Sequence, residues 1–207
     1  MALVQDEDWT ELWKVHFKPR RIGKRLVIRP TWEEFAAGPE DVVIVLDPGQ
    51  AFGTGDHPTT RLCLELLEAE DLEGVHVADI GCGSGILAIA ALRLGAASVV
   101  ASDLDPLAVA VTRENMVRNG VEFPVEVAEG FSILSEPADL IVSNIISATL
   151  IRLAPDAAKW VRSGGKWVVS GIYSTNWPDV RAAAERQGFQ LVNECREDDW
   201  VAATFRR

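Results

Sequence analysis

The sequence contains few of the residues that form covalent cross-links or metal centres. Its 207 residues include only three cysteines and three histidines. Cys63, Cys82 and Cys195 show neither the spacing of a disulfide framework nor that of a metal site, and the histidines form no pair at ligand spacing. We therefore predict a protein of a reducing compartment without a metal centre.

The chain also lacks long apolar runs and an excess of positive charge. No run approaches the length of a membrane span, and no signal peptide opens the sequence, so we predict a cytoplasmic protein without membrane contact. The 20 Lys and Arg residues are outnumbered by 31 Asp and Glu, which gives a formal net charge of -11. This balance argues against a nucleic-acid backbone as the main partner and permits a basic protein partner. It gives no indication of the oligomeric state.

One glycine-rich stretch stands out at residues 75–85, which read V-H-V-A-D-I-G-C-G-S-G. The apolar residues up to Ile80 predict a short buried strand, and the helix-forming residues 86–94 follow the last glycine. A glycine turn between a strand and a helix lets a ligand approach the backbone closely, and the helix amino terminus favours polar or anionic groups. The pattern favours a nucleotide-like ligand, and an ordinary tight turn is the alternative.

A second strand and turn follow at residues 98–104, which read S-V-V-A-S-D-L. Asp103 lies roughly 20 residues beyond the glycine turn, where a nucleotide-binding unit places a carboxylate for the ribose hydroxyls. Alternatively, Asp103 caps the helix that begins near Pro106, although Asp105 could provide that cap without it. The Gly-x-Gly-x-Gly spacing departs from the dinucleotide fingerprint, so we expect no clear pyrophosphate cradle.

The rest of the chain alternates apolar runs with helical patterns, which predicts a doubly wound, mostly parallel α/β sheet. A terminal hairpin that turns at residues 198–199 is expected to add an antiparallel edge strand. We predict residues 1–46 as an amino-terminal extension packed on the core, and residues 47–207 as a single globular domain. The expected strands are residues 26–29, 42–46, 75–80, 98–104, 125–127, 138–146, 166–172, 189–196 and 200–207. The expected helices are residues 8–15, 58–72, 86–94, 107–118, 150–161 and 179–187, with the Ser-Gly-Gly at 163–165 ending the fifth of them.

The segment from Asp47 to Thr60 is rich in glycine and proline and is expected to form a loop before a helix. It combines aromatic, hydroxyl, carboxylate and imidazole side chains close to the glycine turn. That combination favours a ligand lid over an ordinary connector.

Several stretches resemble the PrmA-type ribosomal-protein methyltransferases. They are the loop segments 47–49, 51–55 and 57–60, the glycine turn and helix at 81–90, and residues 144–145 and 163–165. The resemblance covers nearly the whole chain. It implies a class I S-adenosylmethionine-dependent methyltransferase fold, Rossmann-like, with a seven-stranded sheet and S-adenosylmethionine as cofactor. It also implies N-methylation of amino groups, on lysine or the α-amine, in ribosomal protein eleven of the large subunit or a related basic protein.

Roles for individual residues follow partly from the resemblance, as for Asn144, and partly from the chemistry of the side chains, as for His57 and Asp79. Asn144, at the carboxyl end of the fourth strand of the main sheet, would orient the acceptor, although a strand-end turn residue is the alternative. His57 would assist proton removal or form a structural hydrogen bond in the loop. Asp79 is expected to support the glycine turn through backbone amides. The expected cofactor-binding residues are Phe52, Thr54, Gly55, Thr60, Asp79, Gly81, Gly83, Asp103, Leu104 and Asn144.

Two departures from the family bear on the acceptor. The chain begins about where the family's small amino-terminal recognition domain would end, so we expect a catalytic domain without it. Position 56 is Asp, where the family commonly has Thr. The alternatives are a small-molecule methyltransferase and a cofactor-binding module without catalysis. A base-modifying enzyme is disfavoured, because residues 144–147 read N-I-I-S and lack the Asn-Pro-Pro-aromatic that would stack a flipped base.

Overall fold

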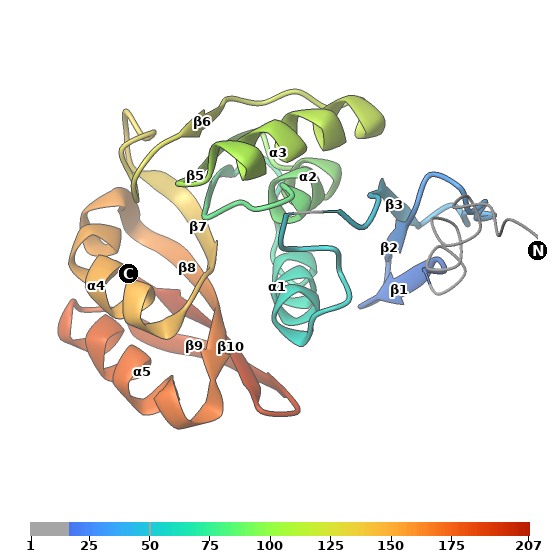
Figure 1. The fold of residues 1–207 in the computed structure, drawn as a ribbon. Coiled ribbons are helices and arrows are strands. Elements are labelled where there is room, and N and C mark those ends of the chain that lie inside the picture. The colour runs from blue at the N-terminus through green and yellow to red at the C-terminus, as the bar shows by residue number, and fades with distance from the viewer. Residues whose placement is uncertain (1–16, 50) are drawn as a thin grey trace, which may run out of the picture.

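A computed structural model describes residues 17–49 and 51–207. The helix predicted at residues 8–15 lies outside these ranges. The described residues form two β-sheets with helices packed around the larger one (Figure 1). The larger sheet contains the glycine turn, so it determines where the site lies.

The larger sheet has seven strands in the order β6-β5-β4-β7-β8-β10-β9. Neighbouring strands from β6 to β8 are parallel, whereas β10 runs antiparallel to both β8 and β9. The predicted α/β fold, with a mostly parallel seven-stranded sheet and an antiparallel pairing at its edge, is confirmed. The strands are β4 (His76–Ile80), β5 (Ser98–Asp103), β6 (Val125–Val127), β7 (Ala138–Asn144), β8 (Val161–Tyr173), β9 (Gln190–Glu197) and β10 (Trp200–Arg206).

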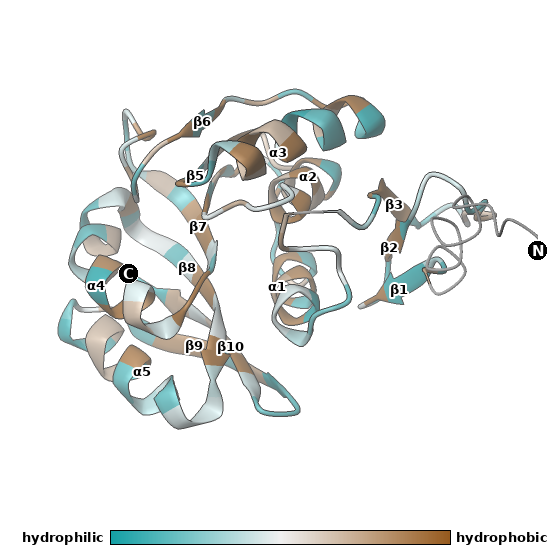
Figure 2. Ribbon diagram, viewed as in Figure 1, coloured by the Kyte–Doolittle hydropathy of each residue, from teal (hydrophilic) through white to brown (hydrophobic). Residues whose placement is uncertain are grey.

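Helices cover both faces of this sheet because successive side chains of a strand point to opposite faces. In β4, Val77 joins the hydrophobic cluster that includes residues of α1, α2 and α3, whereas Ala78 joins the cluster that includes residues of α4 and α5. Figure 2 shows hydrophobic residues along the central strands and a hydrophilic tip on the β9–β10 hairpin. The helices are α1 (Pro58–Glu68), α2 (Ile86–Arg93), α3 (Pro106–Asn119), α4 (Ser147–Trp160) and α5 (Trp177–Arg186), with a short 3-10 helix (Ser174–Asn176) before α5.

The smaller sheet lies on the amino-terminal side and contains β1 (Arg20–Ile22), β2 (Leu26–Arg29) and β3 (Val42–Val45). Strand β1 was not expected from the sequence. It pairs antiparallel with β2, while β3 pairs with β2 in parallel. The buried side chains of Leu26 and Ile44 belong to the same hydrophobic cluster as residues of α1 and α2.

The junction between α4 and β8 corrects one prediction. Helix α4 ends at Trp160 and β8 begins at the next residue, so the Ser-Gly-Gly at 163–165 lies inside a strand and does not end a helix. The glycines serve a close approach of two strands. A Cβ at Gly165 would lie 2.7 Å from the backbone oxygen of Asp139, where the pairing of β7 with β8 shifts register. Helix α1 also ends earlier than expected, at Glu68.

The structure can be examined for membrane-spanning helices, metal ligands and disulfides, of which the sequence shows no sign. No helix among the described residues is both long and apolar enough to cross a membrane. Within residues 17–49 and 51–207, no group of three or more His, Cys, Asp and Glu side chains is placed to hold a metal ion. The three cysteines are free thiols, and burial raises the pKa of Cys63 and Cys82. These two thiols therefore stay protonated and weakly nucleophilic.

The two glycines at the start of β8 make separate predictions for stability. Gly165→Ala should cost roughly 2–3 kcal/mol, because its Cβ would meet backbone atoms that cannot yield. Gly164→Ala should cost only about 1 kcal/mol, because its φ is +79° but nothing lies within 4 Å of a Cβ there. Thermal unfolding measures both, at about 2–4 °C per kcal/mol. Equal losses in the two variants would contradict the proposed close approach of the strands.

Candidate functional site

The glycine turn joins β4 to α2 and keeps three glycines at positive φ, with values of 82° at Gly81, 55° at Gly83 and 78° at Gly85. Other residues rarely adopt this backbone conformation. The surroundings forbid side chains as well, because a Cβ at Gly81 would overlap the side chain of Ile145, and one at Gly83 would lie 2.6 Å from the backbone oxygen of Phe52. The turn is therefore in direct contact with two remote segments of the chain.

An open cavity of about 470 Å³ lies beside this turn. Its floor is formed where β4, β5 and β7 end, which is the edge at which open parallel α/β sheets bind ligands. Its volume falls within the usual range of small-molecule sites. Of the residues expected from the sequence, the cavity brings together Phe52, His57, Thr60, Gly81, Gly83, Asp103, Leu104 and Asn144.

Asp103 is tied to the glycine turn. Its Oδ2 accepts a hydrogen bond from Gly83 N at 2.9 Å, and its Oδ1 accepts one from Asp105 N at 3.0 Å. The cap of α3 is Asp105, whose carboxylate accepts from Leu107 N at 2.9 Å. The capping role is thus filled without Asp103. An ionised carboxylate accepts about four hydrogen bonds, so Asp103 keeps acceptor capacity at the cavity.

Asn144 ends β7 and faces the start of α1. Its Nδ2 donates to Thr60 Oγ1 at 3.3 Å, while its Oδ1 is buried and has no partner among the described residues. An unpaired buried acceptor costs about 1–3 kcal/mol. Asn144 lines the cavity, and its oxygen keeps unused acceptor capacity.

His57 is the amino-terminal cap of α1. Its Nδ1 lies 2.8 Å from Thr59 Oγ1 and accepts from Thr59 N at 3.3 Å. The ring also packs edge-on between two aromatic side chains of the cavity, with centroid distances of 5.4 Å to Phe52 and 4.8 Å to Trp200. The structural hydrogen bond offered as an alternative from the sequence is present, and the role in proton removal stays a prediction.

The loop before α1 divides between the cavity and the amino-terminal sheet. Phe52 lines the cavity and is 55% exposed. Thr54 and Gly55 lie outside the cavity, and a Cβ at Gly55 would meet Ile28 of β2. Asp56 forms an ion pair with Arg20 at 3.5 Å, so its charge is engaged at the protein surface.

Asp79 also lies outside the cavity, behind the turn. It is fully buried, and its Oδ2 accepts from Ala88 N, in the first turn of α2, at 3.1 Å. It therefore supports the helix and makes no hydrogen bond to the amides of the glycine turn itself. Its Oδ1 has no partner among the described residues, and burial raises the pKa of its carboxyl from 3.8 to about 7.

Several cavity residues were not expected from the sequence. Trp200 comes from the start of β10, Gly171 from β8, and Ile145 and Ile146 from the segment between β7 and α4. Glu129 and Arg152 also line the cavity and form an ion pair at 3.0 Å. No motif recognised in the sequence marks these positions as facing a ligand, and the arrangement of the strands brings them to the cavity.

Two solved structures define the class. The ribosomal protein L11 methylase of Lactobacillus delbrueckii subsp. bulgaricus matches with a TM-score of 0.86 over 91% of this chain and 98% of its own, at 32% identity. A 16S rRNA methyltransferase of T. thermophilus, in complex with AdoMet and guanosine, matches with a TM-score of 0.63 over 76% of this chain and 45% of its own. Its 21% identity supports a likeness of fold alone. The architecture is that of a class I S-adenosylmethionine-dependent methyltransferase.

The sequence comparison then gives the family. The profile described as "Ribosomal protein L11 methyltransferase (PrmA)" matches residues 1–207. The ribosomal protein L11 methyltransferase of Heliobacterium modesticaldum is 46% identical over 209 aligned residues, which cover 100% of this chain and 66% of that relative. The chain thus belongs to the PrmA family of ribosomal protein L11 methyltransferases, and the predicted resemblance is confirmed. It spans about two thirds of the length of that relative.

The buried carboxyl of Asp79 predicts a pH dependence of stability. Its pKa is about 7 in the folded protein, whereas the ordinary value, which we take for the unfolded chain, is 3.8. Between these two pH values the folded state therefore keeps a proton that the unfolded state has released. This group therefore lowers stability as pH rises through that window. Asp79→Asn keeps an acceptor for Ala88 N and removes the titration.

We expect the unfolding free energy of Asp79→Asn, relative to the wild type, to increase from pH 5 to pH 8. The limiting size is about 1.4 kcal/mol for each unit of pKa difference. Urea denaturation at a series of pH values measures it. A difference between the two proteins that is constant with pH would show that Asp79 is not protonated in the native state.

Proposed function

We propose that this chain is an S-adenosylmethionine-dependent N-methyltransferase that acts on an amino group of ribosomal protein L11. The observation that carries the proposal is the cavity at the carboxyl edge of the sheet, whose lining includes Asp103, fixed to the glycine turn, and Asn144, whose oxygen has no partner among the described residues. The first group suits a nucleoside, and the second suits a hydrogen-bond donor such as an amine. Family membership supports both assignments.

The residues present fit the cofactor. Asp103 has acceptor capacity for the two ribose hydroxyls, and Gly81 and Gly83 expose backbone at the cavity without side chains. Apolar side chains such as Leu104 and Ile146 supply flat contact area around it. When bound, S-adenosylmethionine supplies a methyl group on a positively charged sulfur.

Asn144 then positions the acceptor. Its Nδ2 donates to Thr60 Oγ1, and we assign to its unpaired oxygen a hydrogen bond from an N–H of the incoming amine. Such a contact would hold the amine nitrogen in one orientation next to the bound cofactor. Transfer requires an in-line arrangement at close range, and such positioning alone supplies a large part of the rate.

The acceptor must be a neutral amine, since a lysine side chain has a reference pKa near 10.4. Partial burial and a neighbouring positive charge both lower that pKa, so the cavity favours loss of the proton before attack. In the proposed transfer the amine lone pair would form the new N–C bond, and the electron pair of the broken C–S bond would leave with the sulfur. We assign the uptake of the amine proton to water or to His57 through the ring nitrogen not bonded to Thr59.

A basic protein acceptor also agrees with the charge of this chain. The net charge of -11 attracts cationic segments, and lysine or the α-amine is the acceptor we propose. The cavity-lining residues fall between Phe52 and Trp200, so we assign the activity to residues 47–207, with residues 1–46 as an extension on this unit. Action on a ribosomal protein would take place in the cytoplasm.

The test is incubation of the purified chain with methyl-labelled S-adenosylmethionine and purified ribosomal protein L11, followed by mass spectrometry of peptides. Label on lysine side chains or on the α-amine supports the proposal. A parallel incubation with a cell extract covers the alternatives. Label confined to small metabolites would indicate a small-molecule methyltransferase, and cofactor binding without any labelled acceptor would indicate a binding module.

Asp103→Ala should weaken S-adenosylmethionine binding by more than about tenfold, because hydrogen bonds to a charged group contribute about 1.5–3 kcal/mol. Isothermal titration calorimetry measures the change. Asp105→Ala is the matched control. It removes the cap of α3 and should lower stability by about 1 kcal/mol while leaving affinity unchanged. Unchanged affinity in a folded Asp103→Ala variant would rule out the ribose contact.

Asn144→Ala should lower turnover roughly a hundredfold with a much smaller change in cofactor affinity, because the side chain orients the acceptor and not the cofactor. Steady-state kinetics with ribosomal protein L11, together with a cofactor titration, separates the two effects. If turnover is preserved, Asn144 is an ordinary strand-end residue and the acceptor is held by other groups.

A further inference from the structure

Ser84 is the point at which the loop before α1 is joined to the glycine turn. Its backbone N donates to Phe52 O at 2.9 Å, and its Oγ donates to Gly53 O at 2.6 Å. Its own carbonyl accepts from Asn115 Nδ2 at 2.9 Å. Ser84 is only 2% exposed and does not line the cavity, whereas Phe52 and Gly53 do.

The loop and the turn lie against each other without space for further atoms. A Cβ at Gly83 would be 2.6 Å from Phe52 O, and a Cβ at Gly53 would be 2.9 Å from Ser84 Oγ. Each glycine is thus required by the opposite segment. The two segments therefore form one wall of the cavity, and Ser84 holds them together from behind.

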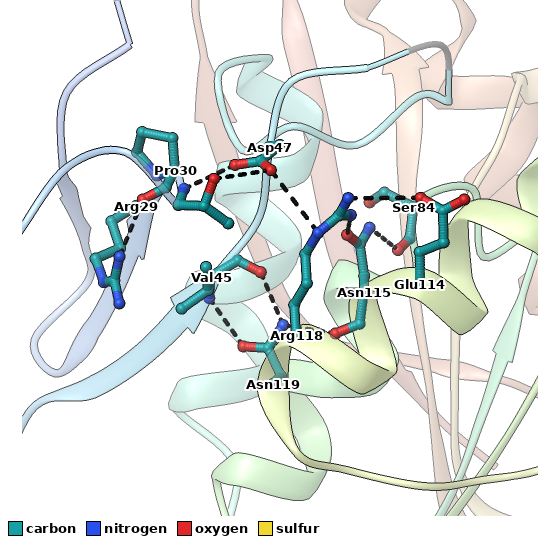
Figure 3. A network of polar contacts seen from close by, with 10 residues as sticks. Arg29, Pro30, Val45, Asp47, Ser84, Glu114, Asn115, Arg118 and Asn119 are labelled. Atoms are coloured by element: carbon teal, nitrogen blue, oxygen red, sulfur yellow. Dashed lines mark hydrogen bonds and ion pairs between the residues drawn. The ribbon is translucent and has the colours of Figure 1, made fainter.

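Asn115 extends this contact through α3 towards the amino-terminal sheet (Figure 3). The residue is 1% exposed, and its Oδ1 accepts from Arg118 Nη1 at 2.7 Å. Arg118 Nε lies 3.7 Å from Asp47 Oδ2, and Asp47 Oδ1 accepts from the backbone N of Thr31 at 2.7 Å. A continuous polar chain thus runs from the segment after β3 to the glycine turn.

One turn further along α3, Asn119 binds the amino-terminal sheet directly. Its Oδ1 accepts from Val45 N and its Nδ2 donates to Val45 O, both at 2.8 Å (Figure 3). The side chain thereby pairs with β3 as a neighbouring strand would. The start and the middle of the loop are therefore both connected to the same helix, the start through Val45 and Asp47, the middle through Ser84.

We propose that Ser84 and Asn115 are positioning residues that hold Phe52 and Gly53 against the glycine turn, and so keep the cavity in its binding-competent form. The inference rests on the proposed function, since it concerns affinity for the cofactor. Neither residue touches the ligand space. Each acts by fixing a wall that does.

The physical basis is the population of the competent arrangement. If only a fraction of the molecules have the loop seated on the turn, the apparent dissociation constant rises by the reciprocal of that fraction. Removal of the Ser84 hydroxyl leaves one of the two bonds to the loop. In Asn115→Asp, a carboxylate oxygen replaces the amide donor and faces the Ser84 carbonyl oxygen. Because two acceptors repel each other, the seated loop should lose more free energy than in Ser84→Ala.

The experiment measures S-adenosylhomocysteine binding by calorimetry for Ser84→Ala, Asn115→Asp and Arg118→Met. We expect the dissociation constant to rise roughly two- to tenfold for Ser84→Ala, by more than about tenfold for Asn115→Asp, and about twofold for Arg118→Met. In assays with ribosomal protein L11, the KM for S-adenosylmethionine should rise while kcat changes little. A residue that only supports the fold would not give this split.

Two matched controls separate positioning from general stability. Ser143→Ala also deletes a buried serine hydroxyl, one that accepts from Trp167 Nε1 at 3.3 Å. Arg113→Met removes an arginine of the same helix that donates to Val125 O at 2.9 Å and does not reach the turn. Both should lower the melting temperature as the test variants do, with the dissociation constant unchanged.

Hydrogen exchange of residues 51–57 gives a readout that needs no ligand. Faster exchange there in Ser84→Ala than in Ser143→Ala supports the inference. Equal exchange in the two variants overturns it, as do unchanged dissociation constants in folded Ser84→Ala and Asn115→Asp. If the wild type fails to bind S-adenosylhomocysteine, the proposed function is wrong, and the exchange data still decide whether Ser84 holds the loop.

Discussion

The carboxyl edge of the sheet depends on a steric constraint, the absence of side chains at Gly81 and Gly83. A Cβ at the first would overlap Ile145, and one at the second would lie 2.6 Å from Phe52 O. The segments that contain Phe52 and Ile145, which are far apart in the chain, can therefore pack directly against the backbone of the glycine turn. The hydrogen bond from Gly83 N to Asp103 and the seating of the loop on Ser84 both follow from that contact. Because the turn has no side chains at these two positions, the segments pack around it, and together with the turn they line the cavity.

Local pattern was sufficient for the central part of the site. A strand, a glycine turn and a helix have one common geometry, so the sequence placed Gly81 and Gly83 at the carboxyl edge of the sheet. The acid after the next strand had to fall beside them, and Asp103 does. The cap at Asp105 followed from Pro106 in the same way. Asn144 was predicted from the end of its strand together with the family resemblance.

The remaining features depend on long-range packing, which local pattern does not encode. Trp200 reaches the cavity because β10 is inserted between β8 and β9, and strand order is not written in either segment. Composition suggested that the whole loop faces the ligand, yet Thr54 and Gly55 lie on the side of β2. The glycine pair at 164–165 resembled a helix stop, but it allows β8 to pass close to β7.

The insertion of β10 has a consequence for biosynthesis. Trp200 packs on His57 at a centroid distance of 4.8 Å and lines the cavity, although it lies more than a hundred residues further along the chain. A nascent chain that has not yet released β10 leaves one side of the cavity open and the edge of β8 unpaired. An unpaired strand edge invites association with other chains. The ligand site is therefore complete only once β10 has paired with β8, so chains synthesised only as far as β9 do not yet have the finished cavity.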